Sequence, residues 1–149
     1  MAQFYSQSYD NRSNFPTVMN AGVQMQHRAS YKFPVATALA VNDWIIFGRL
    51  SEGYIPTAVR ADSDGVANLT VDILLVDDLE SPKTTLTVAT GVSLVSAGVA
   101  QGTLPMNAWR YKGLNVPMYL IAKVNVAASA AKNVEVGVIL DYRYRQNTI

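Results

Sequence analysis

The stretch that decides the fold is NVEVGVILDYRYR, residues 133–145. From Val134 onward every second residue is apolar or aromatic, namely Val134, Val136, Val138, Leu140, Tyr142 and Tyr144. Successive side chains of a β-strand point to opposite faces, so this period of two predicts a long strand with one buried face. The pattern indicates a β-domain and by itself points to no reaction.

Further strands are predicted upstream, at residues 35–41, 44–50, 54–60, 67–75, 84–88 and 118–126. Residues 44–50, WIIFGRL, are apolar on both faces, which predicts a central or interfacial strand. Pro56 cannot donate to a ladder, so its strand should lie at an edge or begin at a bulge. Asn42-Asp43 and Asp62-Ser63-Asp64-Gly65 are turn or loop signals.

Three segments are less regular. Residues 84–104 are ambiguous, because Val92, Val95 and Val99 also fit one or two helical turns. Residues 105–116 are expected to form a long loop, and residues 127–132 a turn of small residues. Seven or eight short strands without strand–helix alternation predict an all-β fold, an antiparallel β-sandwich or barrel.

Residues 1–30 differ from the rest in being rich in Gln, Asn and Ser, with no helical or strand period. We therefore expect an extended or flexible N-terminal arm at 1–30 and a single domain at 31–149. The arm is either a floppy terminus or a segment that becomes ordered on a neighbouring subunit. In the second case its aromatic residues would be the anchors: Phe4, Tyr5, Tyr9 and Phe15.

Composition limits the function. Only 15% of the 149 residues are charged, against about 25% on average. This low charge favours a surface covered by other chains, although uncharged polar residues (Ser, Thr, Asn and Gln) could form a solvent-exposed surface instead. A net charge of +1 gives no case for a nucleic acid or an anionic membrane as partner. The absence of cysteine excludes disulfides, thiolate metal sites and a cysteine nucleophile. No secretory segment or long apolar run is present, which favours a chain made and kept in a cytoplasm, unless it leaves as part of a larger particle.

Candidate catalytic and metal-binding groups are weak. His27, the only histidine, is expected to be a surface residue without a triad around it. The acidic residues Asp72, Asp77, Asp78 and Glu80 fit solvated turn residues better than a glycosidase pair or a calcium site. No phosphate-binding loop is present. We expect no enzyme activity, no metal and no cofactor.

Trp109 and Tyr111 lie in the predicted loop. They could stack on a sugar, or they could anchor a subunit interface, where Trp and Tyr are enriched. The sparse charge favours the interface.

Three stretches of the chain resemble small jelly-roll decoration, or cement, proteins of tailed phages: residues 41–65, VNDWIIFGRLSEGYIPTAVRADSDG; residues 68–78, NLTVDILLVDD; and residues 116–144, VPMYLIAKVNVAASAAKNVEVGVILDYRY. The resemblance implies a jelly roll of about eight strands that assembles as a homotrimer. It would bind the major capsid protein on the outer surface of the virion and stabilise the capsid.

An alternative is a receptor- or carbohydrate-binding β-sandwich of a head fibre or tail. For the decoration protein, removal of residues 1–30 should leave a folded domain that assembles less well.

Overall fold

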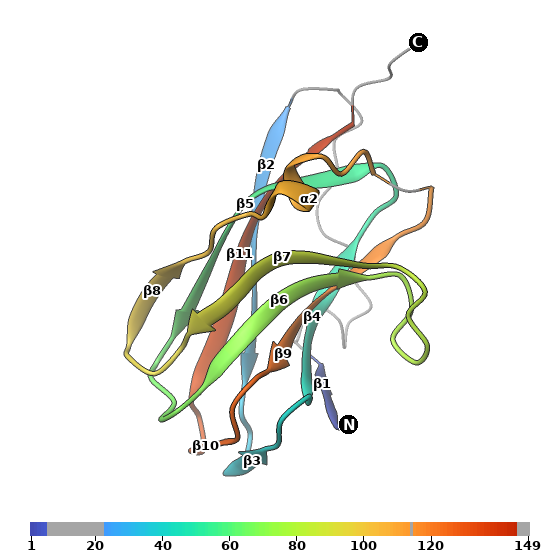
Figure 1. The fold of residues 1–149 in the computed structure, drawn as a ribbon. Coiled ribbons are helices and arrows are strands. Elements are labelled where there is room, and N and C mark those ends of the chain that lie inside the picture. The colour runs from blue at the N-terminus through green and yellow to red at the C-terminus, as the bar shows by residue number, and fades with distance from the viewer. Residues whose placement is uncertain (6–22, 114, 146–149) are drawn as a thin grey trace.

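The computed structural model describes residues 1–5, 23–113 and 115–145. Two sheets pack face to face, and a short helix, α2 (Met106–Trp109), lies at one end (Figure 1). The four-stranded sheet has the order β2 (Gln24–Lys32), β11 (Glu135–Tyr144), β5 (Tyr54–Ser63), β8 (Gly98–Gln101). The five-stranded sheet has the order β1 (Gln3–Tyr5), β4 (Trp44–Leu50), β9 (Met118–Val124), β6 (Thr70–Val76), β7 (Thr85–Ser93).

A small third sheet pairs β3 (Thr37–Leu39) with β10 (Ala128–Ala130) at the opposite end from α2 (Figure 1). Adjacent strands run antiparallel except β1, which is parallel to β4. The predicted all-β sandwich is confirmed, with eleven strands in the described residues where about eight were expected.

β11 lies inside the four-stranded sheet. It pairs with β2 from Glu135↔Lys32 to Arg143↔Gln24, and with β5 on its other side. Its even positions Val136, Val138, Leu140 and Tyr142 are at most 2% exposed. The strand predicted from residues 133–145 is therefore confirmed, together with its buried face.

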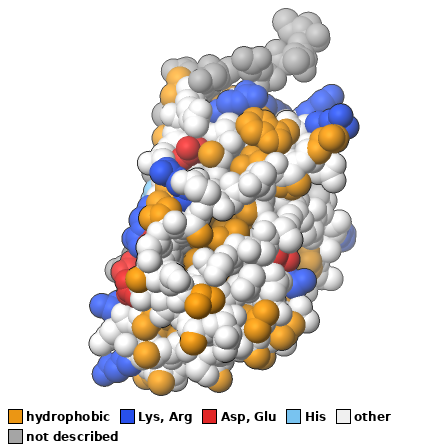
Figure 2. All heavy atoms as spheres, turned by 60° about the vertical axis from the view of Figure 1, so that its left-hand side comes forward, with side chains coloured by type: hydrophobic (Ala, Val, Ile, Leu, Met, Phe, Trp, Pro, Cys, Tyr) orange, Lys and Arg blue, Asp and Glu red, His pale blue; other side chains and the backbone are white. Residues whose placement is uncertain are grey.

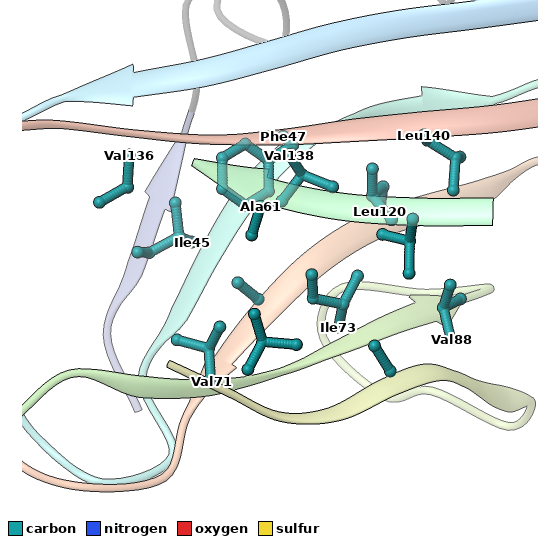
Figure 3. Packing of buried hydrophobic residues seen from close by; sticks show 14 of the residues in the cluster. Ile45, Phe47, Ala61, Val71, Ile73, Val88, Leu120, Val136, Val138 and Leu140 are labelled. Carbon is teal, nitrogen blue, oxygen red and sulfur yellow. The ribbon is translucent and has the colours of Figure 1, made fainter. Parts of the chain in front are cut away.

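The core lies between the two sheets (Figure 3). Side chains of β11 and β5 face those of β4, β6 and β9, and the two layers interlock; labelled examples are Val138 and Leu140 opposite Val71, Ile73 and Leu120. Each fully buried side chain of this size contributes roughly 1.5–3 kcal/mol of transfer free energy. The sandwich is therefore held mainly by contacts between strands far apart in the sequence.

Pro56 occupies the kind of position that its missing N–H requires. The register of β5 against β11 shifts between Asp141↔Ala58 and Tyr142↔Pro56, so Thr57 is the extra residue of a β-bulge. On the other side of β5, β8 pairs only with Arg60–Ser63 among the described residues. β5 is not an edge strand of its sheet, and it begins at Tyr54 rather than at the bulge, but a bulge lies next to Pro56.

The N-terminal third departs from the sequence analysis. Residues 24–32 form β2, so the boundary expected at residue 30 falls inside a strand, and the absence of a strand from residues 1–30 was wrong. Ala29 and Phe33 are buried in the core. Removing residues 1–30 would delete most of β2, so a folded remainder is no longer expected.

Three other segments also differ. Residues 84–104 contain β7 and β8, so the alternative of helical turns was wrong. The turn at 127–132 includes β10, and the loop at 105–116 includes α2.

After β8 the chain passes between β5 and β7 at Gly102. A Cβ there would lie 2.7 Å from Val59 Cγ1 and 2.9 Å from Ala89 Cβ, so the packing leaves no room for a side chain.

Candidate contact surfaces

Phe4, the first of the expected anchors, lies in β1 and points into the sandwich. Its ring centroid is 6.0 Å from that of Tyr31 and 6.3 Å from that of Phe33, and the rings of Tyr31 and Phe33 are 4.9 Å apart. Such tilted and edge-to-face pairs add to the stabilisation gained from burial. This aromatic cluster joins edge strand β1 to edge strand β2 and places Phe4 against the chain's own core.

Tyr5 points to the opposite side of β1 and belongs to a second apolar cluster on the outer face of the five-stranded sheet. Its buried members are Trp44, Ile46, Leu74, Val76 and Ile121, with Tyr5, Leu79 and Tyr119 packed against them. A sheet that is apolar on both faces is normally covered on both. β4 lies between β1 and β9, so the prediction of a central strand at residues 44–50 is confirmed.

Hydrogen bonds fix β1 in this position. The backbone N–H of Ala2 donates to Asp43 Oδ1 over 2.8 Å, and the N–H of Trp44 donates to the carbonyl of Ala2 over 2.9 Å. The Gln3 amide donates to the carbonyl of Leu79 over 2.8 Å. Tyr9 and Phe15, the other two expected anchors, lie outside the described residues.

Trp109 and Tyr111 are close in sequence but differ in exposure. Trp109 ends α2 and is 67% exposed, whereas Tyr111 is half-buried and packs against the core. Met106, at the start of α2, is 62% exposed. The structure therefore places Trp109 beside a second exposed apolar residue of the same short helix and leaves Tyr111 as a supporting side chain.

The surroundings of α2 are basic. Arg110 and Lys112 follow the helix and are exposed. Arg145 approaches the same loop, donating to Asn115 Oδ1 over 2.6 Å, and its backbone N–H donates to the carbonyl of Gly53. Hydrophobic and basic side chains lie next to one another at the top of Figure 2. We call Met106, Trp109, Arg110 and Lys112 the α2 corner.

The acidic residues serve the fold. Asp77 Oδ1 accepts from the N–H groups of Lys83 and Thr84, and Asp78 Oδ1 accepts from those of Glu80 and Ser81. These last two bonds lower the pKa of Asp78. Asp72 Oδ1 accepts from the Gly91 N–H and the Asn125 amide. Three of the four acidic residues, Asp72, Asp77 and Asp78, thus hold turns and strand ends through their carboxylates.

The outer face of the four-stranded sheet carries an ion-pair network. Arg28 of β2 donates to both oxygens of Asp62 on β5, with Nη2 to Oδ2 at 2.6 Å, and to Glu135 Oε1 at 3.2 Å. β11 runs between β2 and β5, so Arg28 reaches Asp62 across Gly137. This network raises the pKa of Arg28, chiefly through its hydrogen bond to Asp62.

His27 is not the simple surface residue that the sequence suggested. It lies on β2, half-buried, and by strand alternation on the same face as Ala29. Burial lowers the pKa of its imidazole, because the charged form loses hydration.

Within residues 1–5, 23–113 and 115–145, no three His, Cys, Asp or Glu side chains come together as a metal site. No helix in this part of the chain is long and apolar enough to cross a membrane.

Comparison with known proteins found similarity in structure only. No protein-family model and no curated protein sequence matches the chain. A chain in the structure titled "Capsid of Ralstonia phage GP4" superposes with a TM-score of 0.78 and 22% sequence identity, over 98% of this chain and 100% of that one. A chain in a cyanophage Pam1 capsid asymmetric unit has a TM-score of 0.44 and 15% identity, over 90% and 95% of the two chains. The second likeness is too distant to carry an argument, and the first establishes a shared fold.

Proposed function

We propose that this chain is a structural protein of a phage virion, a decoration protein that binds the outer surface of the capsid as an oligomer, most simply a homotrimer. The observation that carries the proposal is the end-to-end correspondence in fold with a chain of the Ralstonia phage GP4 capsid structure. Fold alone does not fix function. The sparse charge and the exposed α2 corner supply further support from the chain itself.

The strand order supports a jelly roll as the form of the sandwich. When β1, β3 and β10 are set aside, two four-stranded sheets remain. One has the order β2-β11-β5-β8, and it faces the other, which has the order β4-β9-β6-β7. Along the chain these eight strands change sheet at every connection except that from β6 to β7. Two four-stranded sheets linked in this way are the arrangement of a double Greek key.

We further propose that the chain acts by contact, without a catalytic step. The carboxylates of Asp72, Asp77 and Asp78 already accept hydrogen bonds within their own turns and strands, which leaves them poorly placed for acid–base chemistry. Contact, by contrast, suits a repeated surface. Many weak and symmetric contacts add up when each copy is held beside the next.

The α2 corner is the surface we assign to the capsid. Trp109 supplies a large, rigid and exposed apolar side chain, the type most often found at interface hot spots. Arg110 and Lys112 beside it would favour an acidic partner. Phe4 and Tyr5 are less suited to this contact, because they pack against the chain's own clusters.

The test is co-sedimentation with shells assembled from the major capsid protein of the same phage. The wild-type chain should sediment with the shells, and Trp109→Ala should weaken this severalfold, since truncating a hot-spot aromatic costs about 2 kcal/mol or more. Val126→Ala is the control, because Val126 is 47% exposed and far from α2 at the β3–β10 end. Failure of the wild type to sediment would overturn the proposal. If the wild-type chain instead binds glycans and Trp109→Ala abolishes that binding, the chain is a carbohydrate-binding module.

A further inference from the structure

One stretch of the chain, which forms two edge strands of the sandwich, carries no charge. Between Lys83 and Arg110 the sequence contains no Asp, Glu, Lys, Arg or His. This interval includes β7, the turn that follows it and β8. We call residues 85–101 the uncharged edge. A gap of this length departs from the rest of the chain, where charged residues are spread through both sheets.

Both strands of the uncharged edge are terminal in their sheets. β7 ends the five-stranded sheet beyond β6, and β8 ends the four-stranded sheet beyond β5. A short connection joins them, so the two edges lie on the same side of the molecule (Figure 1). Val95 in this connection is 44% exposed, and Val99 on β8 is 61% exposed.

Figure 2 brings the β8 side of the molecule forward. Charged side chains gather mainly on the left flank and at the top, and uncharged and hydrophobic ones cover most of the centre. Two charged residues of β5 pair with β8: Asp62 lies opposite Val99, and Arg60 lies opposite Gln101. Each has an ion-pair partner, Arg28 at 2.6 Å for Asp62 and Asp141 at 3.9 Å for Arg60. The surface around Val99 therefore presents little free charge to a partner.

Edge strands of soluble proteins are commonly protected by charged side chains, above all Lys. β2, the edge at the other side of the four-stranded sheet, follows this rule with Arg28 and Lys32. β8 is only four residues long, and β7 is interrupted by register shifts against β6, so both offer little continuous backbone for pairing. What the uncharged edge offers a partner is mainly side-chain packing.

We propose that the uncharged edge is a contact surface between copies of this chain. Interface cores are depleted in charged residues, and an uncharged surface meets no like-charge repulsion from another copy. The α2 corner, with its two basic residues, suits a partner of different charge, whereas the uncharged edge has no electrostatic preference for one. This inference rests on the part of the proposed function that has the chain working as an oligomer.

The first test uses Val99→Lys and measures the mass of the oligomer by light scattering. Val35→Lys is the matched control, because Val35 is also 61% exposed but follows β2 at the other side of the sheet. Val99→Lys should shift the mass toward the monomer, because a buried lysine would lose its hydration. Val35→Lys should keep the wild-type mass, and circular dichroism should show that both variants fold.

The second test uses the absence of native cysteine. Val99→Cys and Val35→Cys each give a chain with a single thiol, which a maleimide reagent labels at a rate set by exposure. In the oligomer, Cys at 99 should react at least about tenfold more slowly than Cys at 35, because reaction would require the contact to open. In the denatured chain the two rates should agree.

Three results would overturn the proposal: an unchanged mass for Val99→Lys, equal labelling at the two positions in the oligomer, or a wild-type chain that is monomeric in solution. Protection of position 99 only on capsid shells would assign the edge to the capsid protein instead. Co-sedimentation keeps the two proposals apart. A dissociated Val99→Lys chain that still binds shells supports both, whereas a wild-type oligomer that ignores shells overturns only the decoration function.

Discussion

Replacing Gly137 by alanine tests whether the ion-pair network across β11 is part of the fold. Gly137 lies opposite Ser30 on β2 and Asp62 on β5. A Cβ at this position would be 2.5 Å from Asp62 Oδ1 and 3.0 Å from Arg28 Nη2. The added methyl group would therefore occupy the space in which the Arg28 guanidinium meets the Asp62 carboxylate.

Two opposing effects set the sign. Alanine is favoured over glycine inside a strand by roughly 0.5–1 kcal/mol. Against this, overpacking costs typically about 1–3 kcal/mol. Displacing the Arg28–Asp62 pair adds at most about 1 kcal/mol, since the Arg28 side chain is 44% exposed and its charge is screened by water. We expect a net loss of about 1 kcal/mol in the free energy of unfolding, because steric strain outweighs strand propensity.

The assay is urea unfolding of four chains: wild type, Gly137→Ala, Asp62→Ala and the double variant. Asp62→Ala removes the atom nearest the new methyl group, so in that background Gly137→Ala should cost less, although the backbone carbonyl of Ala29, 3.2 Å from the new Cβ, still crowds it. The size of the Gly137→Ala effect thus depends on Asp62, as expected for residues in contact. If Gly137→Ala stabilises the wild type, or destabilises both backgrounds equally, the role assigned to this glycine is wrong.

Two predictions concern pH. Tyr142 is fully buried, and burial raises its pKa from 10.0 to about 12; the unfolded chain then loses this proton first, so stability should fall by roughly 2–3 kcal/mol between pH 10 and 12. Urea midpoints measured over that range should decline less steeply in Tyr142→Phe. Burial lowers the pKa of His27 below 6.5, so its contribution is present above pH 6.5 and is lost as the pH falls from 6.5 through the lowered pKa of the folded state. His27→Gln should flatten the acid side of the stability profile, and an unaltered slope would contradict this.

The sandwich could be predicted from sequence where a strand has one apolar face or two. β11 alternates over its whole length, and β4 begins with an unbroken apolar run from Trp44 to Phe47, so both were recognised. β2 was missed because its inward face carries Met25, His27, Ala29 and Tyr31, a mixture that does not read as apolar. β2 is ordered by its pairing with β11, a strand more than a hundred residues away in the sequence. A local sequence pattern contains no information about such a distant pairing.

The contact surfaces were predicted less well, for a related reason. Aromatic residues satisfy a core and an interface equally, so sequence alone could not separate Phe4, which packs on Tyr31 and Phe33, from Trp109, which is exposed. A signal for the uncharged edge was present in the gap between Lys83 and Arg110. Its meaning depended on knowing that β7 and β8 both end their sheets on the same side.

The number of copies follows from how the uncharged edge meets its partner. Contact of the edge with itself is isologous and closes a two-fold dimer, whereas a trimer requires the edge to meet a different surface of the next copy. That second surface would have to accept Val95 and Val99 without opposing them with unpaired charge. The outer face of the four-stranded sheet is poorly suited, because Arg28, Asp62 and Glu135 occupy it. A trimer therefore needs a second contact surface away from this face, and also away from Val35, because Val35→Lys is expected to keep the wild-type mass.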